Sequence, residues 1–254
     1  MIDEVAVRRD GAVSVIEIQR GPNNFLDRSL LEALADAFER TDADEDARAI
    51  LLCTEGKNFC AGADFNAGQA PGEALDAAPF YEQALRLFRC EKPVIAAVQG
   101  AAIGAGLGLA LAADFRAATS GTRFSANFNR LGIHPGFGLT VTLPRVIGAQ
   151  RAARLFYTGG ALDGAEAYAL GLADVLTSAD NLRPAALELA TEIARSAPLA
   201  VTSTRRTLRA GLADAVGAAM QVEAAAQKGQ FATMDFREGV AAAKERRLPT
   251  FVGS

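Results

Sequence analysis

The chain has 254 residues, half of them hydrophobic, and 26 basic against 30 acidic residues give a net charge of −4. A chain of this length can bury about three quarters of its unfolded surface, which favours one large domain with an appendage. The charge balance lacks the basic excess of a nucleic-acid-binding protein. The first residues hold no apolar segment of signal-peptide length, so we expect a cytoplasmic protein.

Cysteine and histidine usage limits the chemistry further. The three cysteines, Cys53, Cys60 and Cys90, form no CxxC pair and are expected to be free thiols in a reducing compartment. With His134 as the single histidine and no cysteine cluster, we expect no zinc site.

Strand and helix patterns alternate through the first half of the chain. The predicted strands are Glu4–Val7, Val13–Ile18, Ala49–Thr54 and Val94–Val98. The predicted helices are Leu30–Arg40, with a capping box formed by Ser29 and Glu32, and Phe80–Arg89. Asp10-Gly11 between the first two strands predicts a hairpin. Asp64–Pro79 is rich in Ala, Gly and Pro and is expected to form a mobile loop over a site.

The second half of the chain is dominated by helical patterns. The predicted helices are Arg145–Phe156, Arg183–Ser196, one opened by Pro198, Asp214–Phe231 and Phe236–Arg247. Strands alternating with helices, followed by helices alone, indicate an α/β core with an all-α tail. We expect the core to span residues 1–195 and the helical region residues 196–254.

The segment Pro93–Asp114 carries no charge between Val94 and Ala113 and contains four glycines. It is long enough to span a membrane, but twelve of those twenty residues are Ala or Gly, which contribute little transfer free energy. A dinucleotide fingerprint fails because position 109 is Leu, and no Gly-Lys-Ser/Thr follows for a phosphate loop. The remaining interpretation is a buried strand, a glycine turn and a buried helix, whose N-terminus could polarise a ligand oxygen.

Two strand ends each lead into a turn of small residues, one at Ala61 and the other around Ala105. Two backbone N–H groups converging on one oxygen would form an oxyanion hole. Two ordinary turns remain the alternative interpretation.

Four blocks carry a family resemblance, in order: GKNFCAGADF, KPVIAAVQGAAIGAGLGLALAADF, LGIHPGFGLTVTLPRVIG and DFREGVAAAKERRLPTF. Together they resemble the crotonase, or enoyl-CoA hydratase/isomerase, superfamily over practically the whole chain. The resemblance implies an α/β spiral of ββα repeats with a C-terminal helical trimerisation region. It also implies a homotrimer or dimer of trimers and an acyl-CoA substrate, with coenzyme A as part of that substrate and no separate cofactor.

The resemblance also assigns candidate site residues. The thioester carbonyl would lie between the N–H groups of Ala61 and Ala105 and become an enolate there. The positions expected to line the coenzyme A site are Asn24, Phe25, Ala63 and Asp64. For Asp64, a cap or turn role is the alternative. Arg246 lies where family members often hold a basic residue near the nucleotide phosphates, or it is simply solvated.

The chain departs from the family pattern at both hydratase glutamates, which align with Gly108 and Phe128. General acid or base assistance is typically worth about 10²–10⁴-fold, so hydration by two acids is in doubt. His134 is a candidate base near neutral pH, or it only orders its loop. Asp114 is expected to be structural, Asn127 and Asn129 to satisfy backbone groups, and Cys60 to have no covalent role.

Two hypotheses therefore remain open. The first is a crotonase-type enzyme acting on an acyl-CoA enolate: a hydratase with altered acid/base groups, an isomerase, or a hydrolytic or decarboxylative variant. The second is a non-catalytic acyl-CoA-binding protein that keeps the oxyanion hole and has lost the acids.

Overall fold

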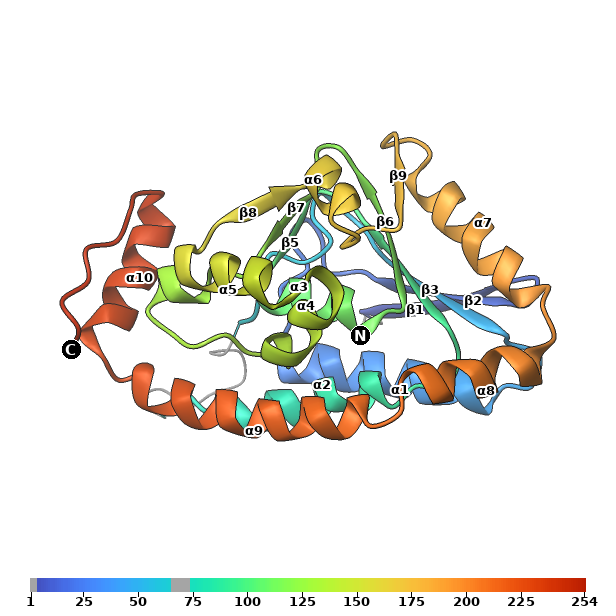
Figure 1. Ribbon diagram of the computed structural model, residues 1–254, viewed down its shortest axis with the longest axis horizontal. Helices are drawn as coiled ribbons and strands as arrows, with labels where there is room; N and C mark the ends of the chain where they lie inside the picture. The colour runs from blue at the N-terminus through green and yellow to red at the C-terminus, as the bar shows by residue number, and fades with distance from the viewer. Residues whose placement is uncertain (1–3, 65–73) are drawn as a thin grey trace.

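A computed structural model describes residues 4–64 and 74–254 of the chain. Its largest sheet has six strands in the order β1-β2-β3-β4-β6-β9 (Figure 1). These strands are β1 Val5–Asp10, β2 Val13–Ile18, β3 Ala49–Thr54, β4 Val94–Val98, β6 Phe115–Thr119 and β9 Val175–Thr177. In this sheet the β1–β2 pair is antiparallel and the other four pairings are parallel.

The N-terminal hairpin confirms the prediction made from its turn residues. Asp10 pairs with Val13 across a tight turn, and Gly11 there adopts a φ of +56° that favours glycine. The continuous apolar run of β3 is buried along its whole length, as expected for a strand covered on both faces.

Helices cover both faces of the six-stranded sheet. Alternate residues such as Val13, Val15 and Leu51 pack with α7 (Leu182–Ala194), whereas Ile16 belongs to the main core on the opposite face. The main core also includes side chains of three helices: α1 Arg28–Ala43, α2 Ala78–Phe88 and α3 Ala105–Ala112. The sheet is thus the middle layer of an α/β core.

A smaller sheet of three strands lies beside this core, in the order β5-β7-β8. Its strands are β5 Ala101–Ile103, β7 Arg123–Ser125 and β8 Ala161–Asp163. The chain leaves β5 and enters α3 through Gly104 alone, so the end of this strand fixes the position of the helix N-terminus. The predicted strand Val94–Val98 and the buried helix are confirmed, with the helix beginning at Ala105, but the turn expected between them contains the short strand β5, which was not predicted.

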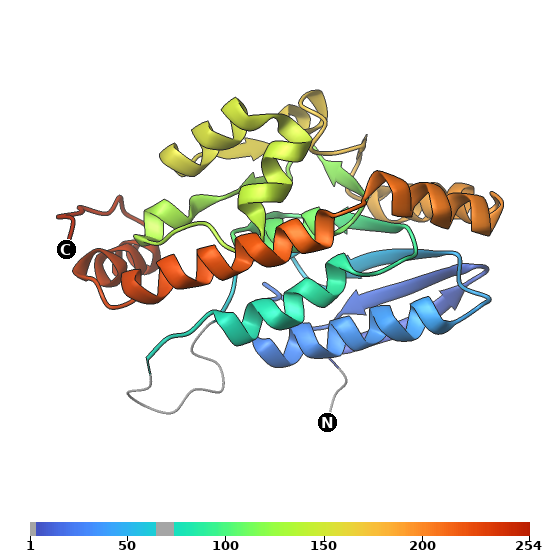
Figure 2. The same ribbon diagram turned by 60° about the horizontal axis from the view of Figure 1, so that its bottom comes forward.

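The remaining helices follow β7. They are η1 Asn127–Leu131, α4 Leu139–Ile147, α5 Ala149–Thr158, α6 Gly164–Ala169, α8 Pro198–Leu208, α9 Leu212–Gln230 and α10 Met234–Glu245. The long α9 packs beside α2 and α4 (Figure 2). The expected division of the chain at residue 195 stays a prediction.

Two local expectations are corrected. The single predicted helix Arg145–Phe156 is two helices, because Gly148 breaks it with a φ of +85°. The first helix is capped by Asp27, whose carboxylate accepts the N–H of Leu30 at 2.8 Å, and Ser29 donates to that carboxylate. None of the helices in the described residues is long and apolar enough to cross a membrane.

Candidate active site

The N-terminus of α3 packs directly against the backbone that follows β3. The backbone N–H of Cys60 donates to the carbonyl of Ala101 at 2.9 Å, and its carbonyl accepts from the N–H of Ile103 at 3.0 Å. A Cβ on Gly106 would lie 2.8 Å from the Cβ of Cys60, so only glycine fits there without displacement. Two segments that are distant in sequence are thereby held in contact.

The first turn of α3 presents unpaired donors at this contact. The N–H groups of Leu107 and Gly108 bond to the carbonyl of Gly104, but within the described part of the chain Ala105 and Gly106 donate to nothing. The free N–H groups carry the positive end of the helix dipole. A ligand oxygen placed here would be stabilised electrostatically.

The second predicted donor, Ala61, is already paired. Its N–H donates to the carbonyl of Asn23 at 2.9 Å, which contradicts the expectation that it is free for a ligand. Gly62, at a φ of +132°, redirects the chain, and the N–H of Ala63 has no acceptor among residues 4–64 and 74–254. Leu26 bonds to Gly62 and Asp64 on either side of Ala63, so the Ala63 N–H is directed away from that neighbouring segment.

Phenyl groups lie at Gly108 and Phe128, the two positions that the family resemblance aligns with the hydratase acids. A Cβ on Gly108 would lie 2.6 Å from the ring of Phe137, which is fully buried. Phe128 is 5% exposed, and a Cβ on Gly104, at the start of α3, would lie 3.6 Å from the tip of its ring. The surroundings of the α3 N-terminus are therefore apolar as well as free of these two carboxylates.

His134 lies in the loop that carries Phe137, and that loop is held by α9. The backbone N–H of His134 donates to Gln230 at 2.6 Å, and its carbonyl accepts from Gln227 at 2.7 Å. Its Nδ1 lies 2.7 Å from the carbonyl oxygen of Pro135, which can only accept, so Nδ1 carries the proton. In the neutral ring this leaves Nε2 with a basic lone pair.

Sequence reasoning missed two buried polar side chains that support this loop. Glu223 accepts from the backbone of Gly138 at 2.7 Å and from the hydroxyl of Thr140 at 2.6 Å, and burial raises the pKa of its carboxyl. The Tyr81 hydroxyl donates to Gln227 at 2.9 Å, and burial raises the pKa of that phenol. Both lie in helices whose apolar pattern gave no signal of a polar contact.

The predicted coenzyme A residues divide into two groups. Asn24 is fully buried, and its side-chain amide donates to the carbonyls of Glu55 at 2.8 Å and Asn58 at 2.7 Å. It holds a loop together and is not available to a ligand, which corrects its assignment. Phe25 is 44% exposed and can contact one.

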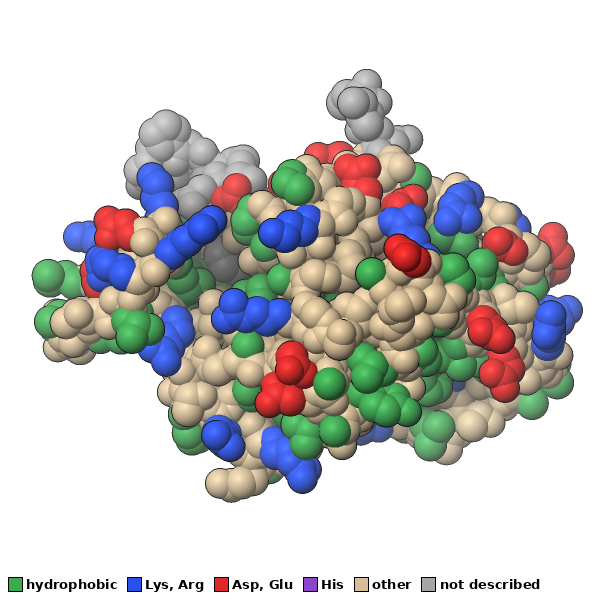
Figure 3. All heavy atoms as spheres, turned by 90° about the horizontal axis from the view of Figure 1, so that it is seen from above, with side chains coloured by type: hydrophobic (Ala, Val, Ile, Leu, Met, Phe, Trp, Pro, Cys, Tyr) green, Lys and Arg blue, Asp and Glu red, His purple; other side chains and the backbone are tan. Residues whose placement is uncertain are grey.

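The remaining assignments lie at the surface or beyond the described ranges. Asp64 is exposed, and the expected mobile loop Asp64–Pro79 falls largely on residues 65–73, outside the described residues. Arg246 is exposed after α10 and forms no ion pair with any described residue, whereas Arg247 pairs with Glu238 at 2.6 Å. Lys and Arg side chains are frequent toward the α10 end of the face in Figure 3.

Other candidates behave as structural residues, as expected. Asp114 accepts the N–H of Val94 at 2.8 Å and pairs with Arg205 and Arg209. Cys60 is completely buried, and burial raises the pKa of its thiol to about 12, which disfavours a thiolate nucleophile.

The neighbouring residue Asn129 has a structural role. Asn129 donates to the carbonyl of Tyr157 at 2.8 Å, as expected of a residue that satisfies backbone. Within the described ranges, no group of three or more His, Cys, Asp or Glu side chains is arranged to hold a metal ion.

Comparison with known proteins places this arrangement in a family. A family model described as enoyl-CoA hydratase/isomerase matches residues 8–254. The chain belongs to this family. It is 33% identical over 255 residues to a crotonyl-CoA hydratase of Syntrophomonas wolfei, covering 98% of each protein. It is also 32% identical over 238 residues to a 1,2-epoxyphenylacetyl-CoA isomerase of Escherichia coli, covering 91% of this chain and 90% of that protein.

A solved structure supports the fold. The enoyl-CoA hydratase/isomerase of Pseudoalteromonas atlantica is 33% identical and superposes with a TM-score of 0.88, covering 98% of this chain and all of the other. The predicted crotonase-like α/β fold is confirmed. Relatives in this family include proteins named as hydratases and one named as an isomerase, so membership supports an enzyme on acyl-CoA without selecting the reaction.

Proposed function

We propose that the protein binds an acyl-CoA thioester and stabilises its enolate with the N–H groups of Ala63 and Ala105. The observation that carries the proposal is that both donors are unpaired, within the described residues, where the loop after β3 meets the N-terminus of α3. Removal of one oxyanion donor typically costs about 3–4 kcal/mol of transition-state stabilisation. Ala63 replaces Ala61 in this role because Ala61 already bonds to Asn23.

In this proposal, coenzyme A enters as part of the substrate and no further cofactor is needed. The exposed Phe25 and the backbone near Ala63 and Asp64 would contact the coenzyme A portion. The exposed guanidinium of Arg246 has the charge to pair with a nucleotide phosphate. A homotrimer or dimer of trimers remains part of the proposal, through the helices after residue 195.

The reaction we propose is a proton shift with His134 as base. The Nε2 lone pair of His134 would remove a proton from the α carbon of a 3-enoyl-CoA. The resulting dienolate would take the same proton back from the imidazolium at the γ carbon, which moves the double bond from the 3 to the 2 position. This route needs no water. It agrees with the phenyl rings of Phe137 and Phe128, which leave no carboxylate at the two hydratase positions.

The alternative is a binding protein without catalysis, and one experiment separates the two. Acyl-CoA is incubated with the protein in D₂O, and α-deuterium incorporation is followed by mass spectrometry. We expect exchange that falls about 10²–10⁴-fold in His134→Ala. Tight binding with no exchange would support the binding protein and contradict the enzyme.

A second assay addresses hydration. Loss of the 2-enoyl-CoA absorbance measures water addition directly, and we expect it to be slow relative to deuterium exchange. A rate typical of a hydratase would contradict the argument from Gly108 and Phe128. His134→Gln provides a matched polar control, because an amide can order the loop without acting as a base near neutral pH.

A further inference from the structure

A positively charged cleft lies away from the α3 N-terminus, where the end of α2 meets α8 and the start of α9. Its volume is about 280 Å³. The charged residues among those that line it are Arg89, Glu91, Arg205, Arg206 and Arg209. Four arginines and one acidic residue therefore line the cleft.

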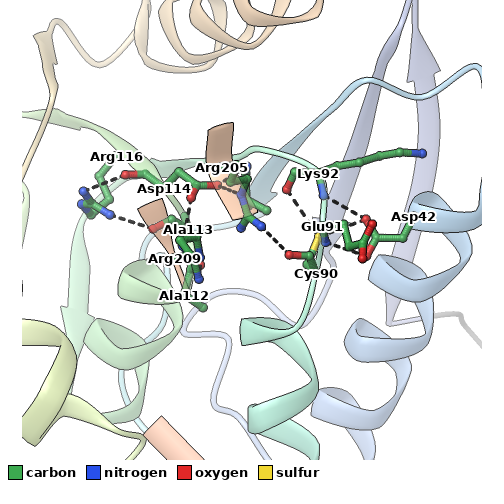
Figure 4. A network of polar contacts seen from close by, with 11 residues as sticks. Asp42, Cys90, Glu91, Lys92, Ala112, Ala113, Asp114, Arg116, Arg205 and Arg209 are labelled. Carbon is green, nitrogen blue, oxygen red and sulfur yellow. Dashed lines mark hydrogen bonds and ion pairs between the residues drawn. The ribbon is translucent and has the colours of Figure 1, made fainter. Parts of the chain in front are cut away.

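The inner wall of the cleft has more positive than negative charge. Asp114 accepts Nε of the buried Arg205 at 2.8 Å and Nη1 of the partly buried Arg209 at 2.9 Å, so one carboxylate balances two guanidinium groups (Figure 4). Asp114 is further occupied by the N–H of Val94. The nearby Arg116 pairs with Asp174 at 3.1 Å.

One nitrogen of the Arg205 guanidinium has no hydrogen-bond acceptor. The side chain is 9% exposed; Nε bonds to Asp114 and Nη1 to the carbonyl of Cys90. Its third nitrogen, Nη2, is buried and finds no acceptor within the described parts of the chain. A buried charged donor without a partner is costly, and an anion within hydrogen-bond distance of Nη2 would remove this cost.

The outer wall adds cations and free backbone donors. Arg89 is exposed and forms no ion pair in the described ranges, and Arg206 has only a 3.5 Å contact with the exposed Glu91. At the start of α9, the N–H groups of Gly211 and Ala213 are unpaired in residues 4–64 and 74–254. Gly211 has no side chain to block them, although Asp214 in the same turn offsets part of the positive helix end.

We propose that this cleft is a binding site for a phosphate group, separate from the acyl-CoA site. A phosphate offers several oxygens at once, which suits guanidinium groups converging with the N–H groups of a helix start. The 19 residues of α9 span about 28 Å, and Arg246 follows the helix beyond the other end of α9. A single phosphate group therefore cannot contact both the cleft at the start of α9 and Arg246.

The test uses the full chain and inorganic phosphate. Phosphate is titrated by calorimetry at constant ionic strength with chloride as the balancing anion, because exposed charges are screened by salt. We expect saturable binding of one phosphate per chain. The double variant Arg89→Gln/Arg206→Gln changes only exposed side chains, so it should fold, and it should weaken binding at least about tenfold.

Arg195→Gln is the matched control, because it removes an exposed arginine that neither lines the cleft nor is assigned to the acyl-CoA site. Binding that is unchanged in this control and weakened in the double variant supports the cleft. Phosphate binding that is lost in the control, kept in the double variant, or never saturable overturns it. Deuterium exchange of acyl-CoA is measured on the same variants, so that loss of one activity is distinguished from loss of the other.

A parallel titration with a nucleoside monophosphate distinguishes the source of the phosphate. Tighter binding than inorganic phosphate, again lost in Arg89→Gln/Arg206→Gln, assigns the site to a phosphorylated metabolite. Equal or weaker binding assigns it to free phosphate.

Discussion

The ring of Phe137 occupies the space into which any side chain at Gly108 would extend, because a Cβ there would lie only 2.6 Å from it. Restoring a glutamate at this position therefore requires that the ring move. We expect Gly108→Glu to destabilise the protein by about 3 kcal/mol or more, through overpacking and burial of an acid. Urea denaturation measures the loss. Gly229→Glu is the control, since a Cβ there meets nothing within 4 Å.

The same contact predicts coupling between the two positions. Phe137→Gly leaves a cavity but relieves the φ of +63° at this residue. In the double variant Gly108→Glu/Phe137→Gly, we expect the loss of stability to be at least about 1 kcal/mol smaller than the sum of the single losses. Strictly additive losses would show that Phe137 does not exclude a side chain from this position.

Glu223 makes stability depend on pH in a defined direction. Burial raises the pKa of its carboxyl above the ordinary value of 4.5, so the folded chain binds this proton more tightly than the unfolded chain. The resulting stabilisation is complete below the ordinary pKa and is lost as pH rises through the raised one. The unfolding free energy of the natural protein minus that of Glu223→Gln should therefore fall between mildly acidic and neutral pH. A rising difference would contradict this.

Asn24 is predicted to matter for stability rather than for ligand affinity. Asn24→Ala removes three side-chain hydrogen bonds and places alanine, which tolerates a positive φ less well than asparagine, at a φ of +49°. Together these changes should cost about 2–4 kcal/mol. Asn24→Gly loses the same bonds but tolerates this φ, so it should be about 1 kcal/mol more stable than the alanine variant. Thermal unfolding compares the pair. A large drop in coenzyme A affinity at unchanged stability would show instead that Asn24 contacts the ligand.

The cysteines are predicted to resist modification in the folded protein. All three are buried, and burial raises the pKa of Cys53 to about 11 and that of Cys60 to about 12, with the pKa of Cys90 raised as well. We expect no iodoacetamide adduct at about pH 8 within minutes and three adducts in urea, counted by mass spectrometry. Rapid native labelling of any one cysteine would contradict its burial.

Local patterns predicted the elements whose signals lie within their own residues. The hairpin follows from Asp10-Gly11, and the buried strand Ala49–Thr54 from its unbroken apolar run. The start of the helix after Gly104 could also be predicted, because glycine turns and small apolar residues are visible in the sequence. The family resemblance supplied the overall fold, an α/β core followed by a helical region.

The errors arise where a tertiary contact decides. Ala61 and Ala63 are equally small, and only the bond from Ala61 to Asn23 shows which N–H is free. Asn24 has the residue type of a ligand, but its amide is consumed by two carbonyls of a distant loop. The lack of an acid at Gly108 is visible in the sequence, whereas the filling of that space by Phe137 depends on how the loop before α4 folds.

The close contact between Gly106 and Cys60 limits which substitutions the site can tolerate. Because its hydrogen atom alone separates α3 from Cys60, even one added methyl group would push the loop after β3 away from the helix. Such a change would leave the core strands intact while widening the gap between Ala63 and Ala105. Substitutions around this contact are therefore tolerated more easily than substitutions within it. If the function proposed above holds, the proton-transferring side chains can change while the spacing of the two N–H groups is preserved.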